Sequence, residues 1–165
     1  MKKILLSLAV ITAFSTISMA SVLDNVNFET NIGVAFDNVK VKGDSGLYNK
    51  TGAEIGFGAE KASSFDNLTY TGALNVGFYD HYETYALDLG GKYKVMPKVN
   101  LLAGISYNLY DVDNMEHYSD GFGVQTGVEY KINNNFSADL KYKYVDLNSG
   151  ITFSHNVVAG VKYFF

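Results

Sequence analysis

The sequence contains no cysteine and no arginine, and its 165 residues include a single proline, Pro97. Without cysteine, neither disulfide bonds nor thiol chemistry can contribute, and three histidines alone argue against a structural zinc site. The formal net charge is −4, and every basic residue is a lysine. An acidic, arginine-free chain lacks the basic surface with which nucleic-acid-binding proteins neutralise phosphate.

Long apolar runs are also missing, except at the N-terminus. Lys2 and Lys3 precede the apolar residues 4–14, and Ser18-Met19-Ala20 places small residues where a signal peptidase reads them. The run is shorter than the roughly 20 apolar residues of a membrane-spanning helix. These features predict a cleaved secretory signal peptide, with a membrane anchor as the alternative.

Two segments follow from this prediction: a signal peptide over residues 1–20 and one mature domain over residues 21–165. The mature domain has 165 − 20 = 145 residues. Loss of Lys2 and Lys3 leaves 11 lysines against 17 acidic residues, so the formal net charge becomes 11 − 17 = −6.

Aromatic residues and glycine are abundant: there are 13 tyrosines, 11 phenylalanines and 16 glycines. This composition, in an exported chain without further apolar runs, predicts an all-β protein. Apolar residues alternate with polar or small ones in eight stretches of about ten residues. The stretches are 28–36, 51–59, 68–78, 85–95, 99–109, 122–132, 136–144 and a last one from near Thr152 to Phe165.

Alternation of this kind is found in two architectures. In a soluble β-sandwich the apolar face points inward, whereas in a transmembrane barrel it points to lipid and the polar face lines the interior. Three features favour the barrel. The polar face is rich in glycine, aromatic residues cluster at the ends of the apolar stripes as in the two girdles of membrane barrels, and the polar face carries both charge signs.

The charges on this face predict an ion-paired network in a narrow interior, because opposite charges there can neutralise one another. Its predicted members are Glu29, Glu54, Asp88, Lys92, Lys94, Glu129, Lys131, Asp139, Lys141, Lys143 and Lys162. The predicted fold is therefore an eight-stranded, antiparallel, up-and-down transmembrane β-barrel. Short connections at 61–67, 96–98 and 133–135 are assigned to the periplasm together with both termini, and the longer connections at 37–50, 80–84, 111–120 and 145–151 to the cell exterior.

The stretches "NNNFSADLKYKYVDL", residues 133–147, and "VNLLAGISYNLYD", residues 99–111, resemble the small outer-membrane β-barrel family, of the kind seen in the OmpA transmembrane domain and OmpX. The resemblance covers essentially the whole mature chain. The terminal Phe165, with Val161 and Tyr163 at alternate positions before it, resembles the signal read by the barrel-assembly machinery of bacterial outer membranes. The resemblance implies an integral outer-membrane protein, but one fold hosts many functions.

No residue set predicts a catalytic, cofactor-binding or metal site. His155 is predicted to face lipid, and the neighbouring Ser154 points to the opposite face of the strand, so the pair does not meet the geometry of nucleophilic catalysis. His81 and His117 fall in loops. The acidic loop "DVDNMEHYSD", residues 111–120, lacks the glycine and spacing of an EF-hand.

The sequence thus predicts a non-enzymatic barrel of the outer membrane, structural or engaged in surface interaction, without an open pore, since porin channels need about 16 strands. The alternatives are a lipid A-modifying barrel enzyme of the deacylase kind and a narrow pore. The predicted partners are outer-membrane lipids and lipopolysaccharide, the assembly machinery, and a host or surface ligand at the extracellular loops, with no cofactor and no nucleic acid.

Overall fold

The computed structural model describes residues 26–43, 46–113, 119–148 and 150–165. The predicted signal peptide, residues 1–20, lies outside them. Eight strands follow one another: β1 Val26–Val41, β2 Leu47–Ala62, β3 Leu68–Tyr79, β4 Tyr82–Met96, β5 Val99–Val112, β6 Ser119–Lys131, β7 Phe136–Leu147 and β8 Ile151–Phe164. None of the described residues forms a helix long and apolar enough to cross a membrane.

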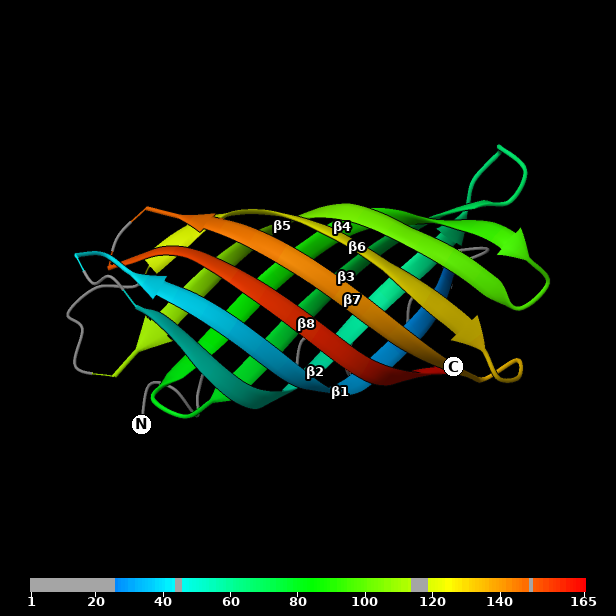
Figure 1. The fold of residues 1–165 in the computed structure, drawn as a ribbon. Coiled ribbons are helices and arrows are strands. Elements are labelled where there is room, and N and C mark those ends of the chain that lie inside the picture. The colour runs from blue at the N-terminus through cyan, green and yellow to red at the C-terminus, as the bar shows by residue number, and fades with distance from the viewer. Residues whose placement is uncertain (1–25, 44–45, 114–118, 149) are drawn as a thin grey trace.

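Each strand pairs antiparallel with its neighbours in the chain, and β8 returns to pair with β1, so that the sheet closes into a barrel (Figure 1). The register joins Gly33 of β1 to Glu54 of β2 on one side and to Gly160 of β8 on the other. The predicted eight-stranded antiparallel barrel is confirmed.

The strands are longer than the ten residues that the alternation predicted: they run from 12 to 16 residues. The β1–β2 ladder continues without a break from Val26↔Lys61 to Lys40↔Leu47. The strands extend beyond the lipid-facing apolar residues because the backbone hydrogen bonds of a hairpin form in water as well as in the membrane. For the same reason the predicted loop at 80–84 is a turn of two residues, Asp80 and His81, in which His81 has a positive φ of 77°.

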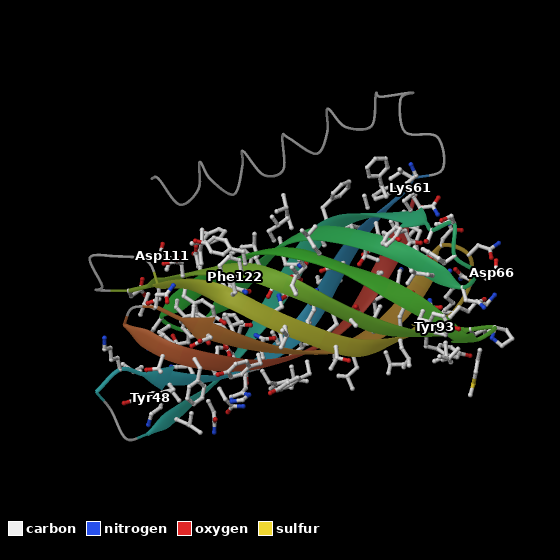
Figure 2. The ribbon with its side chains drawn as sticks, turned by 90° about the horizontal axis from the view of Figure 1, so that it is seen from above. Tyr48, Lys61, Asp66, Tyr93, Asp111 and Phe122 are labelled. Carbon is white, nitrogen blue, oxygen red and sulfur yellow. The ribbon has the colours of Figure 1, made fainter. Side chains whose placement is uncertain are left out.

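The apolar residues face outward and the charged residues face inward. Ile32 is 63% exposed on the outer wall, whereas Glu29, three residues earlier, is 3% exposed inside the barrel. Exposed aromatic residues gather towards both ends of the outer wall, as Tyr93 and Phe122 show in Figure 2. An apolar wall bordered by aromatic rings is the surface that a barrel presents to a bilayer.

One end of the barrel holds the start of β1, the end of β8 and the three short connections between Ala62 and Leu68, Met96 and Val99, and Lys131 and Phe136 (Figure 1). The longest connection, between Val112 and Ser119, lies at the opposite end. Outer-membrane barrels carry their longer loops on the cell exterior, so we assign that end to the exterior and this end to the periplasm.

Candidate functional site

The interior of the barrel near the periplasmic end holds a charged cluster around two lysines. The Lys92 Nζ lies 3.1 Å from Glu129 Oε2 and also pairs with Glu60. The Lys162 Nζ lies 2.8 Å from Glu29 Oε1 and 3.5 Å from Glu129 Oε2. Glu129, which has no exposed surface, is therefore paired with both lysines.

Two further ion pairs occupy the middle of the interior. Lys143 Nζ lies 2.8 Å from Asp88 Oδ1, and Asn75 Nδ2 donates to Asp88 Oδ2 at 2.8 Å. Lys141 Nζ lies 3.2 Å from Glu54 Oε1. A cavity of about 40 Å³ remains between these groups, which is room for one or two water molecules.

The structure brings together nine of the eleven residues of the predicted network. Lys94 and Lys131 are the two that it leaves apart: both project from the inner wall but are exposed at the periplasmic mouth. Alternation assigns a residue to a face, but it does not tell how far along the barrel axis the residue lies, and these two lie beyond the buried layer. Two carboxylates that the network omitted, Asp37 and Glu60, are buried in the interior.

The glycines of the polar face allow this dense packing. Gly90 of β4 stands opposite Gly104 of β5. A Cβ atom on Gly90 would lie 2.5 Å from the carbonyl oxygen of Ala103 and 3.0 Å from the Gly104 Cα. The barrel wall therefore has no room for a side chain at this position.

The extracellular end of the interior is apolar, which the sequence analysis did not predict. We name these buried side chains the extracellular plug: Val39, Tyr82, Tyr110, Val145, Leu147 and Ile151. The Tyr82 ring stacks between Tyr79, at a centroid distance of 4.6 Å, and Tyr110, at 5.9 Å. The sequence does contain a pattern that points to this plug. Val39 and Tyr82 occupy the next inward-facing positions of β1 and β4, beyond the part of each strand that faces lipid.

Asp37 lies directly beneath the plug and joins it to the polar interior. It accepts hydrogen bonds from the Tyr82 hydroxyl at 2.9 Å and from the Ser154 hydroxyl. Nearby, Asn156 Nδ2 donates to the Tyr79 hydroxyl at 2.5 Å. Plug and network together occupy the interior from the extracellular end down to the layer of Lys92, apart from the small cavity between the ion pairs.

Ser154 and His155 face opposite sides of β8. Ser154 is fully buried and donates to Asp37 in the interior. His155 lies on the outer wall, where its Nδ1 is 2.6 Å from the Tyr142 hydroxyl and its ring is 5.1 Å from that of Tyr144. The serine hydroxyl and the imidazole therefore cannot form a nucleophile–base pair in this register.

The loop histidines and the acidic loop supply no metal site within the described part of the chain. His81 Nε2 lies 3.1 Å from Asp80 Oδ2 on an exposed turn. Across the described residues, no three histidine or acidic side chains are placed to hold a metal ion. Glu116 and His117 lie outside those residues.

The assembly residues named from the sequence lie on the outer wall of β8 and just beyond it. Val161, Tyr163 and Phe165 are all exposed, and Phe165 is 70% exposed. The Phe165 ring packs edge-on against Tyr163 at 5.2 Å, and its backbone N–H donates to the Phe28 carbonyl at 3.0 Å. The chain end is thus held against β1.

A closed eight-stranded barrel with an apolar outer wall, aromatic borders and an ion-paired interior defines a transmembrane barrel of the outer-membrane kind. The family model described as "Outer membrane protein beta-barrel domain" matches residues 6–165, and the chain belongs to this family. The protein is an integral protein of the bacterial outer membrane. No curated protein matches its sequence closely enough to count as a relative.

Several solved structures share the fold. Ail, the attachment invasion locus protein of Yersinia pestis, crystallised with the heparin analogue sucrose octasulfate, has a TM-score of 0.58 and 16% identity, over 86% of this chain and all of Ail. Neisserial surface protein A has a TM-score of 0.57 and 18% identity, over 86% of this chain and all of that protein.

A de novo designed transmembrane β-barrel is also similar, with a TM-score of 0.55 and 18% identity over 84% of this chain and 95% of the design. A designed chain matches about as well as the two natural proteins do. The likeness therefore establishes the fold alone, and function has to be argued from the residues of this chain.

Proposed function

We propose that this protein is a non-conducting outer-membrane barrel that stabilises the envelope and binds a surface ligand through its extracellular end. The main support for a barrel without a pore is the extracellular plug, which is hydrogen-bonded through Tyr82 to Asp37. Below it, the ion pairs of Lys143, Lys141, Lys92 and Lys162 cross the interior as far as the recess at the periplasmic mouth.

The charge of the extracellular end indicates the kind of ligand. Three lysines, Lys40, Lys42 and Lys50, lie on or beside the ends of β1 and β2. Six carboxylates lie at the same end on the other hairpins: Asp80, Glu83, Asp111, Asp113, Asp120 and Asp146. Lys50 already lies 3.6 Å from Asp80. The excess of negative charge favours a basic peptide or protein surface and disfavours a sulfated ligand of the kind bound to Ail.

Binding by cells that display the protein tests this ligand class. We expect adhesion to a polylysine-coated surface to exceed adhesion to a heparin-coated surface, and to fall in the double variant Asp80→Asn, Asp113→Asn. The matched variant Lys42→Gln, which removes a positive charge at the same end, should bind polylysine more strongly. Preference for heparin, unchanged in these variants, would contradict the proposal.

Conductance across a planar bilayer tests the closed interior. We expect no single-channel steps from the purified, refolded protein at moderate voltage. Steps of constant size in the wild-type protein would establish the narrow pore instead.

The same proposal holds that the protein is not an enzyme. It is supported by the positions of Ser154, bound to Asp37 inside the barrel, and of His155, which packs with Tyr142 and Tyr144 on the outer wall. Mass spectra of lipid A from cells expressing the wild type and the His155→Ala variant should be identical. A lipid A species that the wild type produces and the variant lacks would establish the lipid-modifying enzyme.

The partners proposed in the membrane are lipids and the assembly machinery. The aromatic residues His155, Tyr144 and Phe153 form one cluster on the outer wall towards the extracellular end, with ring distances of 5.1 to 6.2 Å. This cluster is suited to contact with lipopolysaccharide headgroups, where amphipathic rings are enriched. Val161, Tyr163 and Phe165 at the other end are proposed as the signal that the barrel-assembly machinery reads.

A further inference from the structure

The periplasmic mouth of the barrel contains a recess of about 260 Å³. The 63–67 turn forms one side of it, with Phe65 and Asp66 among the lining residues, and Asn100 and Lys92 form part of its floor. Lys94 of β4 and Lys131 of β6 line the same recess from the inner wall. This recess lies at the opposite end of the molecule from the proposed surface ligand.

The two mouth lysines differ from the lysine beneath them in what they contact. Lys92 is buried, pairs with Glu60 and Glu129, and stacks over the Phe164 ring at 5.1 Å. Lys94 and Lys131 are exposed, and no carboxylate of the described residues lies within ion-pair distance of either. Lys94 and Lys131 therefore place two positive charges on the inner wall without carboxylate partners like those of Lys92.

The ionisable groups that line the recess are Lys92, Lys94, Lys131, Glu60 and Asp66. Glu60 is already paired with Lys92, so Lys94 and Lys131 face the single carboxylate of Asp66, which sits in the 63–67 turn (Figure 2). The hydroxyl groups of Ser63 and Thr69 and the Asn100 amide add polar groups to the wall. The lining thus combines three lysines and two carboxylates, a surplus of one positive charge, with the hydroxyl groups of Ser63 and Thr69.

We propose that this recess binds a small phosphate-bearing anion from the periplasmic side, with Lys94 and Lys131 as the binding residues. A phosphate monoester carries about −1.5 to −2 charges at pH 7, which matches the two lysines better than a single carboxylate does. Lysine binds phosphate as a point charge and needs no bidentate geometry. The recess accommodates a headgroup or a small solute, and it is too small for an acylated lipid as a whole.

Titration of the full-length barrel in neutral detergent with inorganic phosphate, followed by calorimetry, tests the site. We expect saturable binding that weakens as salt is added, because exposed charges are screened. The double variant Lys94→Gln, Lys131→Gln should bind at least about ten-fold more weakly, the loss expected for removing charge-assisted contacts. Asp66→Asn should bind more tightly, because it removes the one opposing unpaired carboxylate.

Lys61→Gln is the matched control, because Lys61 is an exposed lysine at the same end of β2 that does not line the recess (Figure 2). Heat-dependent gel mobility should show that all variants are folded. No binding of phosphate at millimolar concentration, or an equal loss in Lys61→Gln, overturns the proposal.

A second experiment distinguishes a lipid headgroup from a free solute as the natural ligand. The barrel is placed in nanodiscs of phosphatidylcholine with and without phosphatidylglycerol, and inorganic phosphate is titrated into both. Weaker apparent binding in phosphatidylglycerol that depends on Lys94 and Lys131 supports the site and assigns it to lipid headgroups. Equal binding in both nanodiscs supports the site and assigns it to a free solute.

Discussion

Tyr82 and Asp37, 45 residues apart in the chain, are joined by a hydrogen bond of 2.9 Å inside the barrel. The bond connects the apolar plug near the cell exterior to the charged interior below it. Asp37 receives a second hydrogen bond from Ser154 of β8, so three strands converge on one carboxylate. We therefore expect that removing groups from this junction changes the stability of the barrel and the conductance of its extracellular end.

Tyr110→Ala, combined with Tyr82→Ala, should open the extracellular end. Truncation of a large buried side chain costs about 3–5 kcal/mol, and the two rings stack in the same plug. We expect a lower urea midpoint in lipid vesicles and small conductance steps in planar bilayers. Tyr82→Phe keeps the ring and removes only the hydroxyl, so it should lower stability by about 1–3 kcal/mol and remain silent in bilayers. Conductance equal to that of the wild type in the double variant would mean that the plug does not close the barrel.

Lys92→Met and Lys94→Met form a matched pair on one strand. Lys92 neutralises Glu60 and Glu129 while 3% exposed, and removing one partner from a buried ionic cluster costs about 3–5 kcal/mol. Lys94 is exposed at the mouth, where a substitution changes stability by about 0.5 kcal/mol or less. Unfolding in urea should separate the two variants, and equal midpoints would show that the ion pairs of the interior do not stabilise the barrel.

Gly90→Ala and Gly91→Ala test the packing of the wall at adjacent positions. The methyl group of the first meets the Ala103 carbonyl oxygen at 2.5 Å, whereas that of the second meets Leu68 Cδ1 at an ordinary 3.4 Å. Overpacking should destabilise Gly90→Ala by about 1–3 kcal/mol, and Gly91→Ala should change stability by less than about 1 kcal/mol. Refolding yield and urea midpoints measure the difference. If Gly91→Ala were the more damaged variant, the assignment of the two faces would be wrong.

Phe165→Ala should reduce the amount of assembled barrel in cells more than it reduces stability in detergent. The Phe165 side chain is 70% exposed, and its ring lies against those of Tyr163 and Phe57 on the outer wall. Membrane fractionation compared with refolding of the purified chain separates assembly from stability. Leu140→Ala, which truncates an exposed residue in the middle of the outer wall, is the control. A parallel loss in both assays would assign Phe165 a structural role only.

Period-two alternation in the sequence was sufficient to predict eight strands and the two faces of each, and the glycines, mixed charges and aromatic ends indicated which face points into a closed barrel. The reason is local: successive residues of a strand face opposite sides, so Ile32 and Asn31 are separated by geometry alone. The same rule predicts that Ser154 and His155 lie on opposite faces, as the structure shows. A one-residue error in register would have reversed every assignment.

Position along the barrel axis could not be predicted in this way. Lys92 and Lys94 are two residues apart on the same face of β4. Lys92 is nevertheless buried among carboxylates, whereas Lys94 is exposed at the mouth. Ion pairs such as Lys162 with Glu29 join residues 133 positions apart, and their pairing depends on the shear of the closed sheet. The plug was missed because Val39 and Tyr82 lie in strand extensions that the apolar pattern does not mark.

Alternating polarity, together with the glycines and mixed charges of one face and the aromatic ends of the other, therefore determined from the sequence by itself that this protein is a barrel with an apolar outer wall and a charged, glycine-rich interior. Only the tertiary structure decided which charges neutralise one another, which described lysines remain without a carboxylate partner at the periplasmic mouth, and which side chains pack into the extracellular plug. The first outcome depends on the geometry of single strands. The second depends on how all eight strands are staggered when β8 meets β1, a long-range property that no short stretch of residues encodes.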